Sequence, residues 1–264
     1  MDKPQEIPAS TPVSHETLVT AQFGPRAAAY VESAVHATGE DLAALDAIAA
    51  RAAPRRALDL GCGGGHVAYV LARHARAVAA CDLSAEMLAA VAATARARGL
   101  TAIETVEAPA ERLPLPDASV DFVASRFSAH HWRDVEGGLR EARRVAEPGA
   151  PAIFIDIVSP GSPLLDTHLQ AVELLRDPSH VRDYTASEWT GMLTRCGFVV
   201  EACRTWRLKM EFASWIARMR TPETHVQAIR ALQALASEPV RRHFAIEPDG
   251  SFFIDGLMIE ARAA

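Results

Sequence analysis

Along the middle of the chain, short apolar runs alternate with stretches whose apolar residues recur at helical spacing. The apolar runs predict buried strands at residues 56–60, 77–81, 101–107, 119–124 and 152–157. Helical spacing predicts helices at 66–75, after Ser84 and at about 134–146, with Ser84 as an N-cap. Strands that alternate with helices of this length are typical of a parallel sheet with right-handed crossovers.

The last third of the chain has a different pattern. It predicts a helix at 187–196 and strands at 198–206 and 251–261, with helical spacing and no strand signal between those two strands. Two consecutive strands need only a short hairpin loop. We therefore expect residues 209–248 to form an insertion of two or three helices, which would cover the sheet as a lid.

The N-terminal region is expected to have two parts. Residues 1–22 contain three prolines and little periodicity, which predicts a flexible arm. Residues 23–53 have helical spacing and end before Pro54, which predicts an N-terminal cap. We expect one domain at 23–264, made of the cap, a core at 54–208, the insertion at 209–248 and a last strand at 249–264.

The composition is that of an ordinary globular protein. Hydrophobic residues make up 49% of the 264 residues and charged residues 23%, which excludes a disordered chain. The formal net charge of −6 makes a phosphate backbone a poor partner, so no nucleic acid is expected. Because we find no signal-peptide pattern and no uncharged apolar run of about 18 residues, we expect no membrane span and a cytoplasmic location.

The four cysteines are spread along the chain. They form no C-x-x-C pair and no zinc-ligand spacing: Cys62, Cys81, Cys196 and Cys203. This pattern favours reduced thiols, in keeping with a cytoplasmic location, and no bound metal. Cys62 is expected to be a small buried loop residue, because nothing nearby in the sequence marks it as a thiolate.

The sharpest local motif is a glycine-rich turn between the first predicted strand and the next helix. It has the sequence Leu60-Gly-Cys-Gly-Gly-Gly-His66, and such a turn lets a ligand approach the bare backbone. Asp82 ends the second strand 21 residues after Gly61, a spacing suited to binding both hydroxyls of a ribose. The pair predicts an adenosine-type ligand; in the alternative, the glycines only close a turn and Asp82 caps a helix.

Two classes of cofactor compete for this turn. A dinucleotide fingerprint has a third glycine at the sixth position, where this chain has His66. Asp59, two residues before the first glycine, would repel a pyrophosphate but suits a cation such as the ammonium of a methionyl group. S-adenosylmethionine is therefore favoured, and a nucleotide-dependent oxidoreductase is the alternative.

Residues 59–65 resemble the first motif of the class I S-adenosylmethionine-dependent methyltransferases. Residues 81–84 with Met87 resemble the acidic loop of that family, 110–121 the element whose backbone reads the adenine, and 139–149 the helix and turn before the fifth strand. These motifs follow the order of the family over about residues 50–160. The subgroup looks like methyltransferase type 11, the ubiquinone/menaquinone-biosynthesis type, and residues 23–30 resemble its capping helix.

The resemblance implies a Rossmann-like, seven-stranded, mostly parallel sheet with helices on both faces, and S-adenosyl-L-methionine as cofactor with S-adenosyl-L-homocysteine as product. The family often has Asp just before the adenine-reading position, where this chain has Pro109, so Glu111, a backbone carbonyl or stacking would hold the adenine. The expected cofactor-binding residues are Tyr30, Asp59, Gly61, Cys62, Gly63, Asp82, Leu83, Met87, Ala110, Glu111 and Arg126.

Candidate chemistry lies at the end of the fourth strand, in Ser125-Arg-Phe-Ser-Ala-His-His-Trp132. The segment lacks the Asp/Asn-Pro-Pro-Tyr/Phe tetrapeptide found at this point in similar enzymes that methylate nucleobase amines, so DNA methylation is not expected. His130 and His131 can titrate near neutrality. In one interpretation they only cap or pack the next helix; in the other, one of them is a general base, with His131 preferred.

Large aromatic residues gather after residue 185: Trp189, Trp206, Phe212, Trp215, Phe244, Phe252 and Phe253. They suit either a pocket for an apolar or aromatic acceptor or the core of the insertion. Arg218 could clamp an acceptor anion or be solvated, and the candidate acceptor contacts are Trp132, Trp215 and Arg218. We expect in-line methyl transfer to a small molecule by a monomer or homodimer; the other alternative is a non-catalytic S-adenosylmethionine-binding module.

Overall fold

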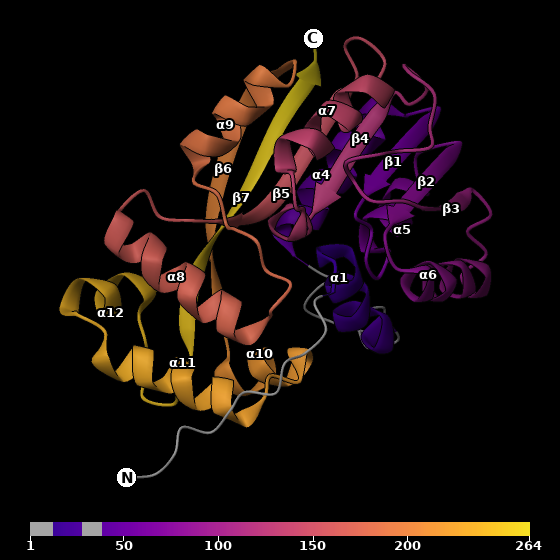
Figure 1. Cartoon of the computed structure of the whole chain (residues 1–264). Helices are drawn as coiled ribbons and strands as arrows, with labels where there is room; N and C mark the ends of the chain where they lie inside the picture. The colour runs from indigo at the N-terminus through magenta and orange to yellow at the C-terminus, as the bar shows by residue number, and fades with distance from the viewer. Residues whose placement is uncertain (1–12, 28–38) are drawn as a thin grey trace.

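The computed structural model describes residues 13–27 and 39–264 and contains one seven-stranded sheet (Figure 1). The strand order is β3-β2-β1-β4-β5-β7-β6. Five neighbouring strands are parallel, and β7 runs antiparallel to both β5 and β6. The strands are β1 (Arg56–Leu60), β2 (Ala77–Asp82), β3 (Ile103–Glu107), β4 (Phe122–Arg126), β5 (Pro151–Val158), β6 (Phe198–Met210) and β7 (Phe252–Ala263). The expected fold class is confirmed.

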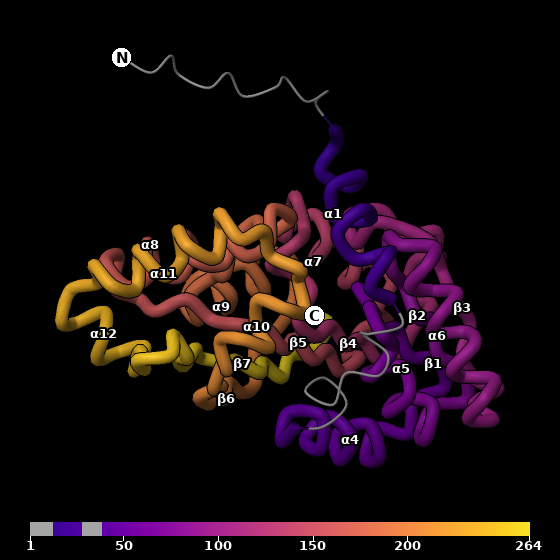
Figure 2. The backbone as a smooth tube through the Cα atoms, turned by 90° about the horizontal axis from the view of Figure 1, so that it is seen from below, coloured from indigo at the N-terminus to yellow at the C-terminus, as the bar shows by residue number. Residues whose placement is uncertain are grey.

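Helices cover both faces of this sheet, which explains why its central strands are apolar on both sides. One face packs against α4 (Glu40–Ala52), α5 (His66–Leu71) and α6 (Ala85–Ala97), and the other against α7 (Val135–Val145) and α9 (Ala186–Arg195). Figure 2 shows α4 and α7 on opposite sides of the strands. Phe122 is buried on the α4 face, and Phe154 is buried on the α7 face.

The expected insertion folds as three helices between the last two strands. It contains α10 (Phe212–Met219), α11 (Glu223–Leu235) and α12 (Glu238–Phe244), which pack against α8 (Pro163–Arg176) (Figure 1). The register pairs Met210 with Phe252, so the insertion sits at the tip of a long hairpin. Its apolar side chains form a third core that is separate from the two sheet faces.

Two stretches differ from the sequence-based expectations, and a third lies outside the described residues. Residues 15–22 of the predicted arm are helical and belong to α1 (His15–Phe23), whose N-cap Ser14 accepts a hydrogen bond from the Thr17 amide through its hydroxyl. The short helix η1 (Gly24–Arg26) follows, and residues 28–38 of the predicted cap, including Tyr30, lie outside the described residues. Helix α8 was not predicted. In the described ranges, no helix is long and apolar enough to cross a membrane.

Candidate active site

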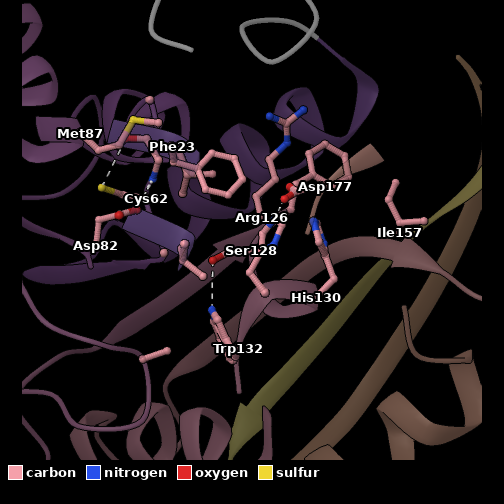
Figure 3. A pocket seen from close by; sticks show the side chains of 18 of the residues that line it. Phe23, Cys62, Asp82, Met87, Arg126, Ser128, His130, Trp132, Ile157 and Asp177 are labelled. Atoms are coloured by element: carbon pink, nitrogen blue, oxygen red, sulfur yellow. Dashed lines mark hydrogen bonds and ion pairs between the residues drawn. The ribbon is translucent and has the colours of Figure 1, made fainter. Parts of the chain in front are cut away.

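A cavity of about 380 Å³ opens where β1, β2 and β4 end. Helix α1 and the helical insertion form its other walls. In Figure 3, Asp82, Cys62 and Met87 lie at one end, with His130, Asp177 and Ile157 at the other. All predicted site residues that the structure describes line it: Asp59, Gly61, Cys62, Gly63, Asp82, Leu83, Met87, Ala110, Glu111, Arg126, His130, His131, Trp132, Trp215 and Arg218.

The glycine-rich turn after β1 is pinned to the neighbouring strand β2. The amides of Gly61 and Cys62 both donate to the carbonyl of Cys81, at 2.9 and 2.8 Å. Gly61 has a φ of 72°, and a Cβ at this position would lie 1.8 Å from Oγ of Ser128. Both the backbone conformation and the close approach of the next loop therefore require glycine at this position.

Asp82 fixes the turn and faces the cavity with the same carboxylate. One oxygen accepts from the Gly63 amide at 2.8 Å and the other from the Ser84 amide at 2.9 Å. Each carboxylate oxygen has a further lone pair, which is what a ribose diol requires. The cap of α6 is made by the Ser84 hydroxyl, which accepts from the Met87 amide, so the helix-capping alternative for Asp82 does not hold.

Asp59 is buried under the same turn, where its side-chain oxygen accepts from the Ala68 amide at 2.8 Å in the first turn of α5. Burial raises the pKa of Asp59 to about 8, despite this hydrogen bond. At neutral pH the carboxyl is therefore mostly protonated, and a nearby cation would favour its ionised form.

The end of the cavity beyond Asp82 is lined mainly by apolar side chains. Met87 and Ala110 are buried there, and Leu83 and Pro109 lie beside them. The Glu111 carboxylate accepts from the Asp134 amide at 3.1 Å, which ties it to the start of α7. Burial raises the pKa of the neighbouring Cys62 thiol, which is therefore neutral, as expected for a buried loop residue.

Arg126 forms a buried ion pair that the sequence did not predict. Its Nε donates to the Asp41 carboxylate at 2.5 Å, with the two side chains only 6% and 4% exposed. The guanidinium also lies 4.5 Å from the centre of the Phe127 ring. Because Asp41 is in the first turn of α4, the pair joins that helix to the end of β4. In the sequence, Asp41 looks like an ordinary acidic residue of a helix N-terminus.

His130 is held by a buried carboxylate from the neighbouring strand. Its Nδ1 lies 2.5 Å from an oxygen of Asp156 on β5, and that carboxylate also accepts from the Ile157 amide at 2.8 Å. Burial lowers the pKa of His130, but the carboxyls of Asp156, Asp183 and Glu173 outweigh this effect and raise it to about 9. With Nδ1 engaged, Nε2 is the ring nitrogen left for a ligand.

His131 has different neighbours and a different basicity. Its Nδ1 donates to the Ser179 carbonyl at 3.2 Å, and its ring meets Phe23 of α1 edge-on at 4.9 Å. Burial and the adjacent His130 lower the pKa of His131 to about 4. Its own carbonyl lies 2.8 Å from a ring nitrogen of His15, so this residue is where α1 contacts the site.

The large aromatic residues of the insertion mostly form its core. Trp215 is only 1% exposed, stacks edge-on against Phe252 at 5.0 Å and reaches the cavity wall as well. Phe212 and Phe244 are buried in the core of the insertion. For Phe212 and Phe244, the structure therefore agrees with the interpretation that they form the core of the insertion. Trp132 is buried at the wall of the cavity, and its indole nitrogen donates to the Ser128 hydroxyl at 3.0 Å.

Sequence reasoning missed the acidic residues around the two histidines. They are Asp156, Glu173, Asp177 and Asp183, and all are buried. Asp156 had a usable signal, since a charged residue inside an apolar strand is costly to bury without a partner. The other three lie in α8 and the loop after it, for which the sequence predicted no element.

Comparisons with known proteins identify the relatives of this chain. Residues 58–154 match the family described as a methyltransferase domain. The chain is 47% identical over 200 residues to the uncharacterized protein YafE of Escherichia coli, covering 76% of this chain and 97% of that protein. It is 33% identical over 224 residues to the uncharacterized methyltransferase YcgJ of Bacillus subtilis, covering 85% of this chain and 88% of that protein.

Solved structures give the same result. The crystal structure of YcgJ superposes with a TM-score of 0.81 at 30% identity, covering 84% of this chain and 97% of that chain. A putative methyltransferase from Bacillus halodurans superposes with a TM-score of 0.82 at 30% identity, covering 85% of this chain and 99% of that chain. The ubiquinone/menaquinone biosynthesis C-methyltransferase UbiE of Rubrivivax gelatinosus is a more distant relative, 35% identical over 113 residues and 43% of each chain.

Proposed function

The chain is a class I S-adenosylmethionine-dependent methyltransferase, and we propose that it methylates a small, largely apolar molecule bound between His130 and the helical insertion. The observation that carries the proposal is that a single cavity extends from the glycine-rich turn and Asp82 to His130 and the insertion. Its volume of about 380 Å³ lies in the range of ligand pockets.

The described residues fit the cofactor at the first end of this cavity. Asp82 offers lone pairs to the two ribose hydroxyls, and Asp59 offers a carboxyl to the ammonium. Leu83, Met87 and Ala110 offer apolar contacts to the adenine. When bound, S-adenosylmethionine supplies a methyl group on a positively charged sulfur and leaves as S-adenosylhomocysteine.

The opposite end supports an apolar or aromatic acceptor. Its wall is lined by Ile157, Leu208, Met210, Trp215 and Ile254, which come from β5, β6, α10 and β7. Apolar walls with a few placed polar groups are typical of small-molecule sites. Residues of α1 and of the insertion also line the cavity, and they would exclude water from a bound acceptor.

His130 is the better candidate for taking a proton from the acceptor. Asp156 fixes its orientation through Nδ1 and raises its basicity, as a carboxylate does in known histidine-based catalytic sites. His131 is a far weaker base, with a pKa of about 4. The geometry thus reverses the preference drawn from the sequence: we assign proton removal to Nε2 of His130 and the docking of α1 to His131.

Calorimetry with S-adenosylmethionine, S-adenosylhomocysteine and NAD tests the cofactor assignment. We expect the first two to bind and NAD not to bind, and Asp82→Ala to abolish the binding. Replacing Ile157, at the other end, with Trp should spare S-adenosylhomocysteine binding and abolish methylation of any acceptor that the wild type accepts. Binding of NAD alone would contradict the cofactor assignment, and unchanged methylation by Ile157→Trp would contradict the acceptor assignment.

A further inference from the structure

Four buried carboxyls stand around the acceptor end of the cavity, and three of them have clear partners. Asp156 holds His130. Asp177 accepts from the amide and hydroxyl of Ser179, at 2.9 and 2.6 Å. Glu173 lies 3.4 Å from a guanidinium nitrogen of Arg176. These contacts explain how three acidic side chains tolerate burial.

The fourth carboxyl, Asp183, has no such partner. The residue is 1% exposed and lines the cavity, yet its Oδ2 has no hydrogen-bond partner within residues 13–27 and 39–264. The nearest basic nitrogen is Nε2 of His180 at 4.0 Å, and that nitrogen lies 2.9 Å from the Gln170 side-chain oxygen. Gln170 also holds both the amide and the carbonyl of Asp183, which fixes its backbone.

The positive groups near Asp183 are already engaged with other partners. Arg176 pairs with Glu173 and donates to the Trp215 carbonyl at 3.1 Å. Arg182 pairs with Asp166 at 3.1 Å. His130 is paired with Asp156, and His180 is neutral because burial lowers its pKa to about 2.

An unpartnered buried carboxyl at the wall of a binding cavity is a strong sign of a missing ligand group. Burying such a group is unfavourable unless a hydrogen-bond donor or a cation meets it, so native structures rarely keep one. Burial raises the pKa of Asp183 well above its usual value, although the positive charge of nearby His130 acts in the opposite direction. The side chain is thus poised to accept a donor group and to ionise when that group is positively charged.

We propose that Asp183 anchors the methyl acceptor by binding a protonated amine that the acceptor carries in addition to the atom that is methylated. This inference rests on the proposed function. It makes the acceptor an amphipathic molecule, with an apolar body against Ile157 and Trp215 and a donor group at Asp183. It also argues against an acceptor carboxylate or phosphate at Asp183.

Four matched phenols test the proposal on the full-length protein saturated with S-adenosylhomocysteine. They are tyramine, 4-(2-hydroxyethyl)phenol, 4-ethylphenol and 3-(4-hydroxyphenyl)propionate, which differ at one end as ammonium, hydroxyl, methyl and carboxylate. We expect calorimetry to show tyramine binding at least tenfold more tightly than 4-ethylphenol. 4-(2-Hydroxyethyl)phenol should bind with intermediate affinity, and 3-(4-hydroxyphenyl)propionate should bind most weakly.

Two variants separate charge from hydrogen bonding at Asp183. Asp183→Asn keeps the size of the side chain and one hydrogen-bond acceptor oxygen. In this variant tyramine should bind less than threefold more tightly than 4-ethylphenol, and the preference for 4-(2-hydroxyethyl)phenol over 4-ethylphenol should be unchanged. Asp183→Leu should remove both preferences. Asp117→Asn is the matched control on the exposed surface and should keep the wild-type ranking.

The proposal is wrong if the wild type does not prefer tyramine to 4-ethylphenol. It is also wrong if this preference persists in Asp183→Leu and Asp183→Asn, or if none of the four phenols binds at 10 mM. Binding of S-adenosylhomocysteine is measured in the same titrations. If it is retained while the preference is absent, the anchor alone is wrong. If it is lost in the wild type, the proposed function fails as well.

Discussion

The buried carboxyls of this site differ in their surroundings, and the surroundings of each one set its protonation state. Burial raises the pKa of both Asp59 and Asp183, and the positive charges of Arg126 and His130 only partly offset this effect. Asp156 instead shares a short hydrogen bond with His130 and gives that imidazole its basicity. The charges that a ligand meets are therefore set by burial and pairing, which residue type alone does not reveal.

Cofactor binding should release a proton from Asp59. Its pKa of about 8 leaves it mostly protonated at pH 7, and the ammonium of a bound methionyl group favours the ionised carboxylate. We expect about one proton to be released when S-adenosylhomocysteine binds at pH 7, and little in Asp59→Asn. Calorimetry in phosphate and Tris buffers measures this number from the difference in enthalpy. Equal release by the wild type and Asp59→Asn would contradict the assignment.

Methyl transfer to a hydroxyl should become faster as pH rises. His130 has a pKa of about 9 and must be neutral to accept a proton, so kcat/KM should rise about tenfold per pH unit to a plateau near pH 9. His130→Ala should slow transfer about 100-fold or more without loss of S-adenosylhomocysteine binding.

Ionisation of the acceptor itself could also make kcat/KM rise with pH, and Asp156→Asn distinguishes this from ionisation of His130. Removing the carboxylate lowers the pKa of His130, so the rise in kcat/KM should move to lower pH and reach a lower plateau. The acceptor's own pKa in solution is unaffected by this substitution. A pH profile that is the same in both proteins would exclude His130 as the base.

At the scale of elements, two helices from the N-terminal part of the chain are joined to the candidate site by polar contacts. Helix α1 reaches His131 through His15, and Arg26 of η1 donates to the Met219 carbonyl at the end of α10, at 2.7 Å. Helix α4 is joined to β4 through the pair of Asp41 and Arg126. These helices therefore shape the cavity without belonging to the sheet.

Loss of the His15 contact should loosen the cover that α1 forms. One hydrogen bond contributes about 1 kcal/mol, so His15→Ala should weaken S-adenosylhomocysteine binding by about fivefold. Thr20→Ala removes a hydroxyl that bonds only within α1, to the Glu16 carbonyl, and should leave the affinity unchanged. Equal affinity of His15→Ala and the wild type would show that α1 does not cover the bound cofactor.

The Asp41–Arg126 pair should matter for stability more than an exposed ion pair. Asp41→Asn removes the counterion of a buried guanidinium and should lower the free energy of unfolding by about 3–5 kcal/mol, measured in urea. The double variant with Arg126→Leu should be more stable than the sum of the single losses predicts. Additive losses would mean that the two side chains do not interact.

At the scale of the whole molecule, the sequence predicted the features that depend on local pattern. The strands, the glycine-rich turn and a helical insertion of two or three helices follow from periodicity and glycine placement, and the structure contains them, with three helices in the insertion. Asp82 lies at the glycine-rich turn, as its spacing from Gly61 over one strand–helix–strand unit predicted.

What the sequence did not show depends on contacts between distant segments. Asp41 meets Arg126 across 85 residues, and Asp183 reaches the cavity from a loop after a helix that was not predicted. The choice between His130 and His131 likewise depends on which imidazole meets Asp156. None of these pairings has a periodic or spacing signal, because each forms only when the sheet and the insertion have assembled.

The most direct test of the whole account is a crystal structure of the protein with S-adenosylhomocysteine and tyramine. The account predicts both ribose hydroxyls on Asp82, the phenol oxygen facing Nε2 of His130 and the ammonium on Asp183, all within the one cavity. Adenosine bound away from Asp82, or a tyramine whose phenol does not face His130, would contradict it.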